Sequence, residues 1–205
     1  MRWQVQRDTA LPETWTWTRL NDVFDVRDGT HDSPKYVSDG FPLVTSKNLY
    51  TGRLDLTDVK LISAEDHRQI CDRSKVDRED ILFAMIGSIG NPVIVDVEPN
   101  FSIKNVALFK YYDRNLSEPS FLHLYLIHAS ERLKRITAGG VQSFVSLGFL
   151  RKYPFPLPPL AEQKRIVARV EELLRWCDTL EAQLHQTRTL GAHLLDSTLH
   201  HLLAA

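Results

Sequence analysis

The C-terminal quarter of the chain carries a regular stripe of apolar residues. They recur at alternating intervals of four and three, at Ile166, Val170, Leu173, Cys177, Leu180 and Leu184. This spacing is typical of the a and d positions of a coiled coil. A stripe this narrow fits one partner helix better than a whole core. We therefore predict that residues 160–205 form a long helix that packs against another helix.

Two neighbouring prolines, Pro158 and Pro159, determine where this helix can begin. A proline disfavours helical geometry at the residue before it, so the helix is expected to start near Leu160. Residues 154–159 are interpreted as a proline-rich joint, and residues 1–153 as a globular domain. The alternative, in which the helix packs back onto this domain, is less favoured because the joint would lift the helix away. Gly191 is the position at which an interruption of the helix is expected.

The pattern before the joint mixes strand-length apolar runs with helical periodicity. Residues 17–26 predict a strand, or a short helix followed by a strand, and residues 41–45, 80–86, 93–97 and 103–111 predict further strands. A capping pair, Ser63 with Asp66, predicts a helix to about residue 73. Helical spacing after Pro119 predicts a second helix that ends at a Gly-Gly pair, residues 139–140, with a loop over residues 141–149. The predicted fold class is α+β: a mixed β-sheet domain with flanking helices, followed by a long coiled-coil-type helix.

Composition and charge narrow the function classes. A hydrophobic fraction of 43% supports a packed core. Residues 160–205 hold five of the 25 basic and six of the 26 acidic residues, so the preceding domain has 20 of each and no net charge. Nucleic-acid binders usually have a basic surplus, so the positive charge must be gathered on one face or supplied by partners. Two cysteines, a polar start and the lack of an apolar run of ~20 residues indicate a cytoplasmic protein without a membrane span.

The sequence gives little support for catalysis. The glycine-rich residues 87–91 lack the Lys-Ser/Thr of a phosphate loop, and a strand rather than a helix is expected after them. The Pro158-Pro159 pair lacks the preceding Asn or Asp of the amino-methyltransferase motif. His123 and His128 lie on different helix faces, so no metal site is predicted. A nucleophile–base pair stays open, although no serine or cysteine lies in a recognisable elbow.

Polar loops are the remaining candidates for a functional surface. Residues 30–35, 46–48, 88–91, 102–105 and 142–143 are rich in Lys, Asn, Gln, Ser and His. Such side chains donate hydrogen bonds to phosphates and read base edges. Composition alone nevertheless favours plain surface loops on a structural module.

The chain resembles the specificity (S) subunit of type I restriction-modification enzymes along nearly its whole length. The resembling segments are residues 11–34 (LPETWTWTRLNDVFDVRDGTHDSP), 40–49 (GFPLVTSKNL), 80–91 (DILFAMIGSIGN), 102–109 (SIKNVALF) and, most specifically, 139–167 (GGVQSFVSLGFLRKYPFPLPPLAEQKRIV). The resemblance implies a DNA target recognition domain that reads one half of a split site. It also implies that the following helix pairs antiparallel with another and sets the spacing between two such domains.

The resemblance also implies the partners. Methyltransferase (M) and restriction (R) subunits are separate chains in this family, and S-adenosylmethionine, ATP and Mg are expected on them rather than here. A typical S subunit has two recognition domains and two helical regions, whereas this sequence has one of each. It resembles a natural half-subunit or an excised half. A second copy would then complete a homodimer, for which we expect a palindromic bipartite DNA site.

The resemblance supports the loops more than any single residue, because recognition domains vary between members. The predicted DNA contacts are Thr30, His31, Ser33, Lys35, Lys47, Asn48, Ser88, Asn91, Lys104, Asn105 and Gln142. For Asn48, Asn91 and Asn105, turn formation is an equally good interpretation. A different class of function also stays open: a protein-interaction or regulatory module that binds M or S subunits without reading DNA. An independent enzyme is the third hypothesis, and it lacks a catalytic cluster.

Overall fold

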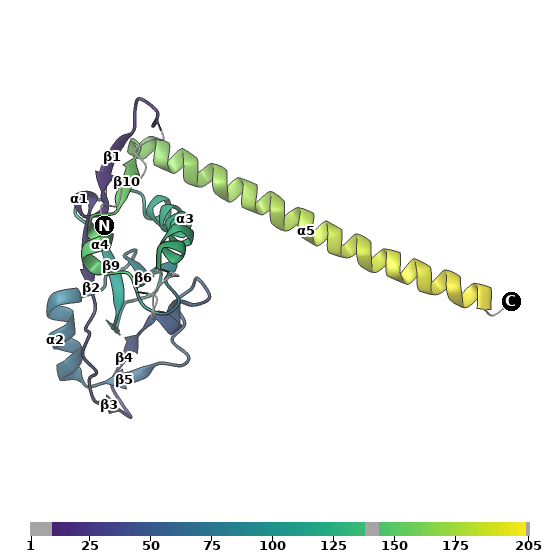
Figure 1. The fold of residues 1–205 in the computed structure, drawn as a ribbon. Coiled ribbons are helices and arrows are strands. Elements are labelled where there is room, and N and C mark those ends of the chain that lie inside the picture. Colours follow the sequence, from purple (N-terminus) through teal and green to yellow (C-terminus); the bar gives the residue numbers. More distant parts are fainter. Residues whose placement is uncertain (1–9, 138–143, 204–205) are drawn as a thin grey trace. The chain divides into compact units, whose positions relative to one another are not determined.

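The computed structural model describes residues 10–137 and 144–203, except for the side chains of residues 197, 198 and 201. The chain divides into two compact units, Met1–Lys164 and Arg165–Ala205. The first, which we call the head, contains two four-stranded sheets, and the second consists of helix α5 beyond its first turn (Figure 1). The mixed sheets, the flanking helices and the long C-terminal helix confirm the predicted fold class.

The first sheet is antiparallel and holds most of the core. Its strands are β2 (Phe24–Asp28), β9 (Val106–Tyr111), β6 (Ile81–Ala84) and β7 (Gly90–Ile94), in the order β2-β9-β6-β7. All four residues of β6 are buried, as an apolar run at the centre of a sheet requires. Helix α3 (Pro119–Thr137) packs against β7. Its start confirms the prediction, while the Gly-Gly pair expected to stop it lies outside the described residues.

The second sheet is mixed. It contains β3 (Tyr36–Val37), β5 (Lys60–Ile62), β4 (Phe41–Val44) and β8 (Ser102–Ile103), and β4 pairs with β8 in parallel. A short 3₁₀ helix (Ser46–Leu49) follows β4, where a loop was predicted. Helix α2 (Ala64–Ser74) packs against β8. Ser63 Oγ accepts from the Asp66 amide at 3.1 Å, which confirms the predicted cap.

One predicted strand is wrong in a way that matters for function. Residues 103–111 do not form a continuous strand, because β8 ends at Ile103 and β9 begins at Val106, each in a different sheet. Asn105 between them has a φ of 55°. Asparagine adopts this left-handed conformation more readily than other non-glycine residues. The chain therefore breaks at Lys104-Asn105 and passes from one sheet to the other.

The predicted proline-rich joint also needs correction. Residues 154–157 form strand β10 (Pro154–Leu157), which pairs with β1 (Thr16–Arg19) in a two-stranded antiparallel sheet. Prolines are tolerated there because each of the two strands has a single neighbour among the described residues, so one edge of each is left unbonded. Phe155 is fully buried and makes edge-to-face contacts with Phe24, Phe121 and Tyr125. These residues therefore belong to the head.

Two short helices complete the head. Helix α1 (Leu20–Val23) lies between β1 and β2, which confirms the helix-then-strand alternative. Helix α4 (Leu147–Arg151) stands where a loop was predicted. Ser146 caps α4 by accepting from the Phe149 amide at 3.2 Å. A helix of one turn leaves little periodicity in the sequence, which explains why it was missed.

Gln163 ties the first turn of α5 (Leu160–Leu203) to the head. Its side chain is fully buried. Its Oε1 accepts from the Glu118 amide at 2.9 Å, and its Nε2 donates to the carbonyls of Leu116 and Pro158, each at 2.9 Å. One carboxamide thus satisfies three backbone groups in the interior.

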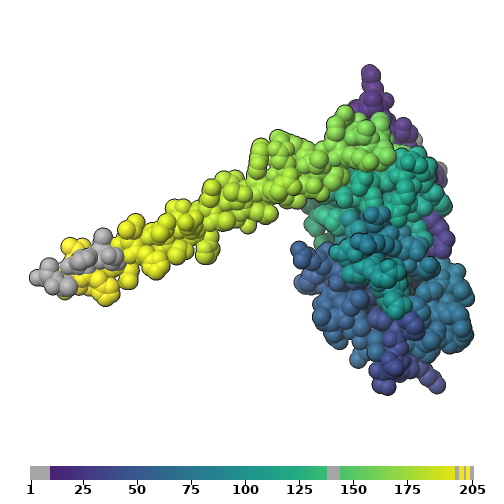
Figure 2. Space-filling model, turned by 180° about the vertical axis from the view of Figure 1, so that it is seen from behind, coloured from purple at the N-terminus to yellow at the C-terminus, as the bar shows by residue number. Residues whose placement is uncertain are grey.

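Beyond that turn, α5 is a single uninterrupted helix that continues through Gly191. Figure 2 shows its side chains in yellow-green to yellow along its length. Ile166 and Val170 are half-buried. The later members of the predicted stripe are exposed, with Leu180 at 64% and Leu184 at 54%. Cys177, which we interpreted as a small buried residue of a seam, is also exposed in the single chain.

The Gln163 contacts lead to a first prediction. Gln163→Leu keeps the size of the side chain but leaves an amide and two carbonyls without partners, so we expect the free energy of unfolding to fall by roughly 3 kcal/mol. Urea unfolding of the two proteins, followed by tryptophan fluorescence and circular dichroism, measures the difference.

The matched control is Gln186→Leu, at an exposed glutamine of the same helix. We expect it to change the unfolding free energy by no more than about 0.5 kcal/mol. Equal effects of the two substitutions would show that the buried carboxamide contributes nothing specific.

Candidate nucleic-acid interface

Two loops that are far apart in the sequence are joined by backbone hydrogen bonds. Thr30 and Lys104 form an isolated parallel bridge. The Thr30 amide donates to the Ile103 carbonyl at 3.0 Å, and the Asn105 amide donates to the Thr30 carbonyl at 3.1 Å. The Lys104 amide donates to the Val44 carbonyl at 2.8 Å. These bonds fix the break between β8 and β9 against the loop that follows β2.

Side-chain contacts extend this junction into a cluster. Lys104 Nζ donates to Ser33 Oγ at 2.5 Å, and one ring nitrogen of His31 lies 2.8 Å from Asn105 Oδ1. Five of the predicted contact residues thus come together, and we call them the recognition cluster: Thr30, His31, Ser33, Lys104 and Asn105. His31 and Ser33 are exposed, and the other three are half-buried. The cluster presents cationic and polar donors on a fixed backbone.

Gly29 allows the two loops to approach this closely. A Cβ on this residue would lie 2.1 Å from the Ile103 carbonyl oxygen and 2.4 Å from its carbon. Backbone atoms cannot move aside as the end of a flexible side chain can. The Gly29 amide also donates to the Val106 carbonyl at 3.0 Å. Only glycine fits this position without separating the loops.

Two charged residues outside the predicted set, Asp28 and Arg73, contact the recognition cluster and the backbone next to it. Asp28 Oδ2 lies 2.8 Å from His31 Nε2, and its side chain is only 16% exposed. Arg73, from the last turn of α2, donates to the Gly29 carbonyl at 2.7 Å and lies 3.6 Å from Asp28 Oδ1. The hydrogen bonds that the His31 ring makes to the Asn105 and Asp28 oxygens raise the pKa of His31 above its usual 6.5, while burial and the charge of Arg73 oppose that rise.

The other predicted residues make no hydrogen bond to the recognition cluster within the part of the chain that is described. Lys47 pairs with Asp58 at 3.0 Å. Ser88 lies on the β6–β7 connection, and Asn91 lies in β7 with a φ of 47°. Lys35 is exposed before β3. Gln142 lies outside the described residues.

Asn48 needs a correction. Its side chain is buried, with 3% of the residue exposed. Its Nδ2 donates to the carbonyls of Asp55 and Asp58, and its Oδ1 accepts from the Thr45 amide at 2.9 Å. The amide is therefore used to build the loop after β4. The alternative interpretation, turn formation, applies to this residue.

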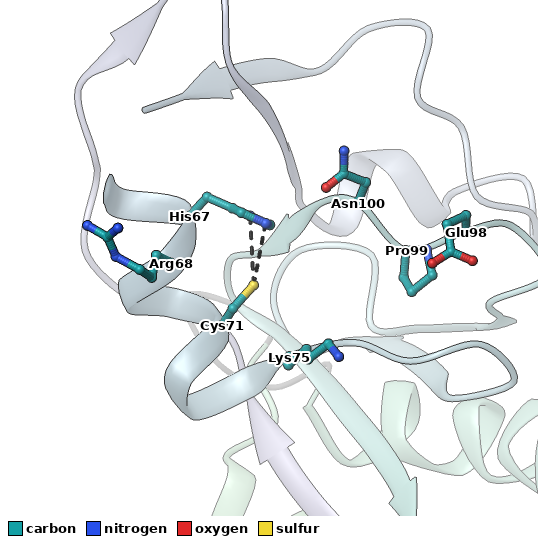
Figure 3. Close-up of a pocket in the computed structure, with 7 residues that line it drawn as sticks. All are labelled: His67, Arg68, Cys71, Lys75, Glu98, Pro99 and Asn100. Atoms are coloured by element: carbon teal, nitrogen blue, oxygen red, sulfur yellow. Dashed lines mark hydrogen bonds between the residues drawn. The ribbon is translucent and has the colours of Figure 1, made fainter. Parts of the chain in front are cut away.

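A pocket beside α2 contains a cysteine next to a histidine, the residue types of a nucleophile–base pair. It is lined by His67, Arg68, Cys71, Lys75, Glu98, Pro99 and Asn100 (Figure 3). The Cys71 sulfur lies 3.7 Å from the ring nitrogens of His67. Burial raises the pKa of the Cys71 thiol and lowers the pKa of His67. Both shifts favour a neutral thiol beside a neutral imidazole, which is the opposite of an activated cysteine.

His67 has a structural role in this pocket. Its ring stacks on Phe41 with centroids 4.1 Å apart, and its Nδ1 lies 2.8 Å from Ser102 Oγ. These contacts attach α2 to β4 and β8. Within residues 10–137 and 144–203, no three His, Cys, Asp or Glu side chains are grouped as metal ligands would be. No helix in these ranges is long and apolar enough to cross a membrane.

Comparison with known proteins identifies the family. The model of the type I restriction modification DNA specificity domain matches residues 12–187. This chain belongs to that family. The Escherichia coli type I restriction enzyme EcoBI specificity subunit is 29% identical over 202 residues, which cover 92% of this chain and 41% of that protein. The chain thus spans about two fifths of the length of this relative.

Solved structures show the same fold. A chain from a structure of the type I R-M system, described for its assembly and conformational transition, superposes with a TM-score of 0.67 at 23% identity and covers 89% of this chain and 44% of that one. The HsdS subunit from Thermoanaerobacter tengcongensis gives 0.64 at 23% identity, with coverages of 86% and 41%. The family and fold predicted from the sequence are confirmed. The relative is a specificity subunit, which supports the prediction of a non-catalytic chain.

Asp28 and Arg73 are not among the residues that the sequence pattern indicated. Asp28 directly precedes the polar loop and resembles an ordinary acidic residue at the end of a strand. Arg73 lies 44 residues after Gly29, on a helix, and nothing in the local pattern indicates that it reaches the Gly29 carbonyl. Polar residues in different parts of the chain could be grouped only once the break at Asn105 was known.

A second prediction concerns the close approach at Gly29. Gly29→Ala must separate the two loops, so we expect it to lower the free energy of unfolding by about 2 kcal/mol. Amide hydrogen exchange gives the more specific measurement, because the amides of Thr30 and Asn105 should lose their protection.

Gly148→Ala serves as the control, because a Cβ there meets nothing within 4 Å and the residue lies in α4. We expect it to leave exchange at Thr30 and Asn105 unchanged. Normal protection of both amides in Gly29→Ala would contradict the close-approach argument.

Proposed function

We propose that this chain reads one half of a bipartite DNA site as part of a type I restriction-modification complex in the cytoplasm. The observation that carries the proposal is the recognition cluster, in which backbone hydrogen bonds hold two polar loops together. The specificity-domain family of the chain supports it. In this proposal the chain itself is non-catalytic, and S-adenosylmethionine, ATP and Mg bind to the M and R subunits.

The chemistry of the recognition cluster suits DNA. The Lys104 ammonium can donate to a phosphate or to a guanine edge, and the Asn105 Nδ2 group, which His31 does not hold, can donate to an acceptor on a base edge or phosphate. The backbone bridge holds these donors in place before binding, which reduces the ordering entropy that binding would otherwise cost. Thr30 Oγ accepts from the Asp32 amide at 3.1 Å, which further stiffens the loop.

Because the head has no net charge, other subunits are expected to contribute to its affinity for DNA. With 20 basic and 20 acidic residues before position 160, the domain has little long-range attraction for DNA. Contacts from the recognition cluster can supply specificity without much non-specific binding. We propose that M subunits supply the additional phosphate contacts and dock against this chain.

The apolar stripe of α5 supports pairing with a second helix. Over 44 residues an unbroken helix measures about 66 Å, using 1.5 Å per residue. Leu173, Leu180 and Leu184 lie exposed along it. Antiparallel pairing of two copies would cover these side chains and relate two heads by a twofold axis. A homodimer of this kind would read a palindromic bipartite site.

The neutral head also favours the alternative function. A module that binds M or S subunits without touching DNA needs no basic surface, and the exposed leucines of α5 would suffice for it. Methylation sequencing of cells that carry this chain with its M subunit separates the two. A bipartite methylated motif supports DNA reading, and a lack of methylation contradicts it.

A third prediction tests the recognition cluster directly. Lys104→Gln removes one cation, so we expect weaker DNA binding at every sequence and a salt slope that is smaller by about one. Lys152→Gln, at the exposed end of α4, is the matched control and should change neither value. Titration of the complex with DNA at several salt concentrations measures both. Identical slopes for Lys104→Gln and the unmodified protein would contradict a phosphate contact at Lys104.

A fourth prediction tests the helix. We expect the isolated chain to sediment as a dimer at tens of micromolar, and Leu180→Asp to shift it to monomer. Ala182→Asp lies at the outermost heptad position, between two members of the stripe, and should leave the dimer intact. A chain that stays monomeric at these concentrations without M subunits would contradict self-pairing while leaving DNA reading in place.

A further inference from the structure

His31 meets an oxygen atom at each of its two ring nitrogens. Nδ1 lies 2.8 Å from Asn105 Oδ1, and Nε2 lies 2.8 Å from Asp28 Oδ2. An ionised carboxylate and an amide oxygen can only accept hydrogen bonds. Both ring nitrogens must therefore donate, and this arrangement belongs to the imidazolium form of His31.

Neutral histidine cannot keep both contacts. It has one donor and one acceptor nitrogen. Asp28 holds the proton on Nε2, so deprotonation leaves Nδ1 as an acceptor that faces Asn105 Oδ1. Two acceptors at 2.8 Å repel each other. A half-turn of the Asn105 carboxamide removes this conflict, because the amide nitrogen then donates to Nδ1.

The opposite side of the Asn105 carboxamide is open. Its Nδ2 makes no hydrogen bond to any described residue, and it is not among the buried polar atoms that lack a partner. It therefore faces solvent beside Lys104, within the recognition cluster. Whichever amide group His31 does not hold is the group presented outward.

We propose that His31 and Asn105 form a proton-coupled pair in which the charge of His31 determines whether Asn105 presents a donor or an acceptor to DNA. Its DNA role rests on the proposed function. With His31 charged, the outward group is an NH₂, which suits phosphates and acceptor edges such as guanine O6. With His31 neutral, the outward group is an oxygen, which suits donor edges such as cytosine N4.

Asp28 is the positioning residue of this pair. It faces His31 from the end of β2, Arg73 faces both from α2, and Asn105 faces His31 from the β8–β9 break. The hydrogen bond to Asn105 and then that to Asp28 raise the pKa of His31 above 6.5, against burial and Arg73. The donor-outward state therefore prevails below the raised pKa and is lost as the pH rises through it.

The test uses the whole chain without DNA. Nuclear magnetic resonance of the ¹⁵N-labelled protein follows the ring nitrogens of His31 and the side-chain NH₂ of Asn105 from about pH 5 to 8. We expect the His31 midpoint above 6.5 and the Asn105 signals to shift with the same midpoint. In the neutral form the proton should be on Nε2. Asn105 signals that do not change as His31 titrates would overturn the proposal.

Two variants separate coupling from folding. Asp28→Asn is nearly isosteric and should lower the His31 midpoint and weaken the preference for the Nε2 proton. His31→Gln replaces a side chain that is 56% exposed, so the fold should tolerate it, and the Asn105 signals should become independent of pH. An unchanged His31 midpoint in Asp28→Asn, with the fold intact, would also overturn the role of Asp28.

A DNA measurement distinguishes failure of this inference from failure of the proposed function. As the pH rises through the His31 midpoint, the affinity for a duplex of about 30 base pairs at low salt should fall roughly tenfold. The affinity of His31→Gln should not change over the same pH range. No binding at any pH would contradict DNA reading, while the DNA-free titration still decides the coupling. Equal pH dependence of the two proteins would overturn the link between His31 and DNA.

Discussion

The backbone hydrogen bonds around Gly29 and Thr30 are the constraint on which the recognition cluster depends. They join the end of β2, in the antiparallel sheet, to Ile103 and Asn105 at the edge of the mixed sheet. Every member of the recognition cluster lies within a few residues of this junction. The junction is possible because residue 29 has no Cβ and because residue 105 accepts a left-handed conformation. The same bonds thus connect the two sheets and position the polar side chains.

The sequence predicted what local patterns encode. Ser63 and Asp66 mark the start of α2, Pro119 that of α3, and the Pro158-Pro159 pair that of α5. Contacts over long sequence distances were not predictable in this way. Strands β1 and β10 pair although they lie about 140 residues apart in the sequence. The prolines of β10 led us to predict a joint there instead of a strand. The predicted strand over residues 103–111 ran from Ile103 across the polar pair Lys104-Asn105 into the apolar run that starts at Val106, and the pair was not interpreted as a break.

The candidate site was also predictable only where local sequence was sufficient. Residue type located the polar loops, since Lys, Asn, Ser and His are the donors that DNA recognition uses. It could not tell an exposed asparagine from one that builds a turn. Asn48 and Asn105 look alike in the sequence, yet Asn48 is buried with its amide fully bonded, while Asn105 keeps one side of its amide open. Burial, which depends on tertiary packing, makes the difference.

The first turn of α5 belongs to the head through the buried side chain of Gln163. Gln163 bonds the Glu118 amide before α3 and the Leu116 and Pro158 carbonyls, so the first turn of α5 is part of the head's interior. The Gln163 carboxamide collects backbone groups that lie 45 and 47 residues before it in the sequence. No local pattern around Gln163 indicates these partners, because they depend on how the chain before α3 packs against the end of β10. The buried glutamine therefore belongs with the β1–β10 pairing, as a contact that only tertiary packing determines.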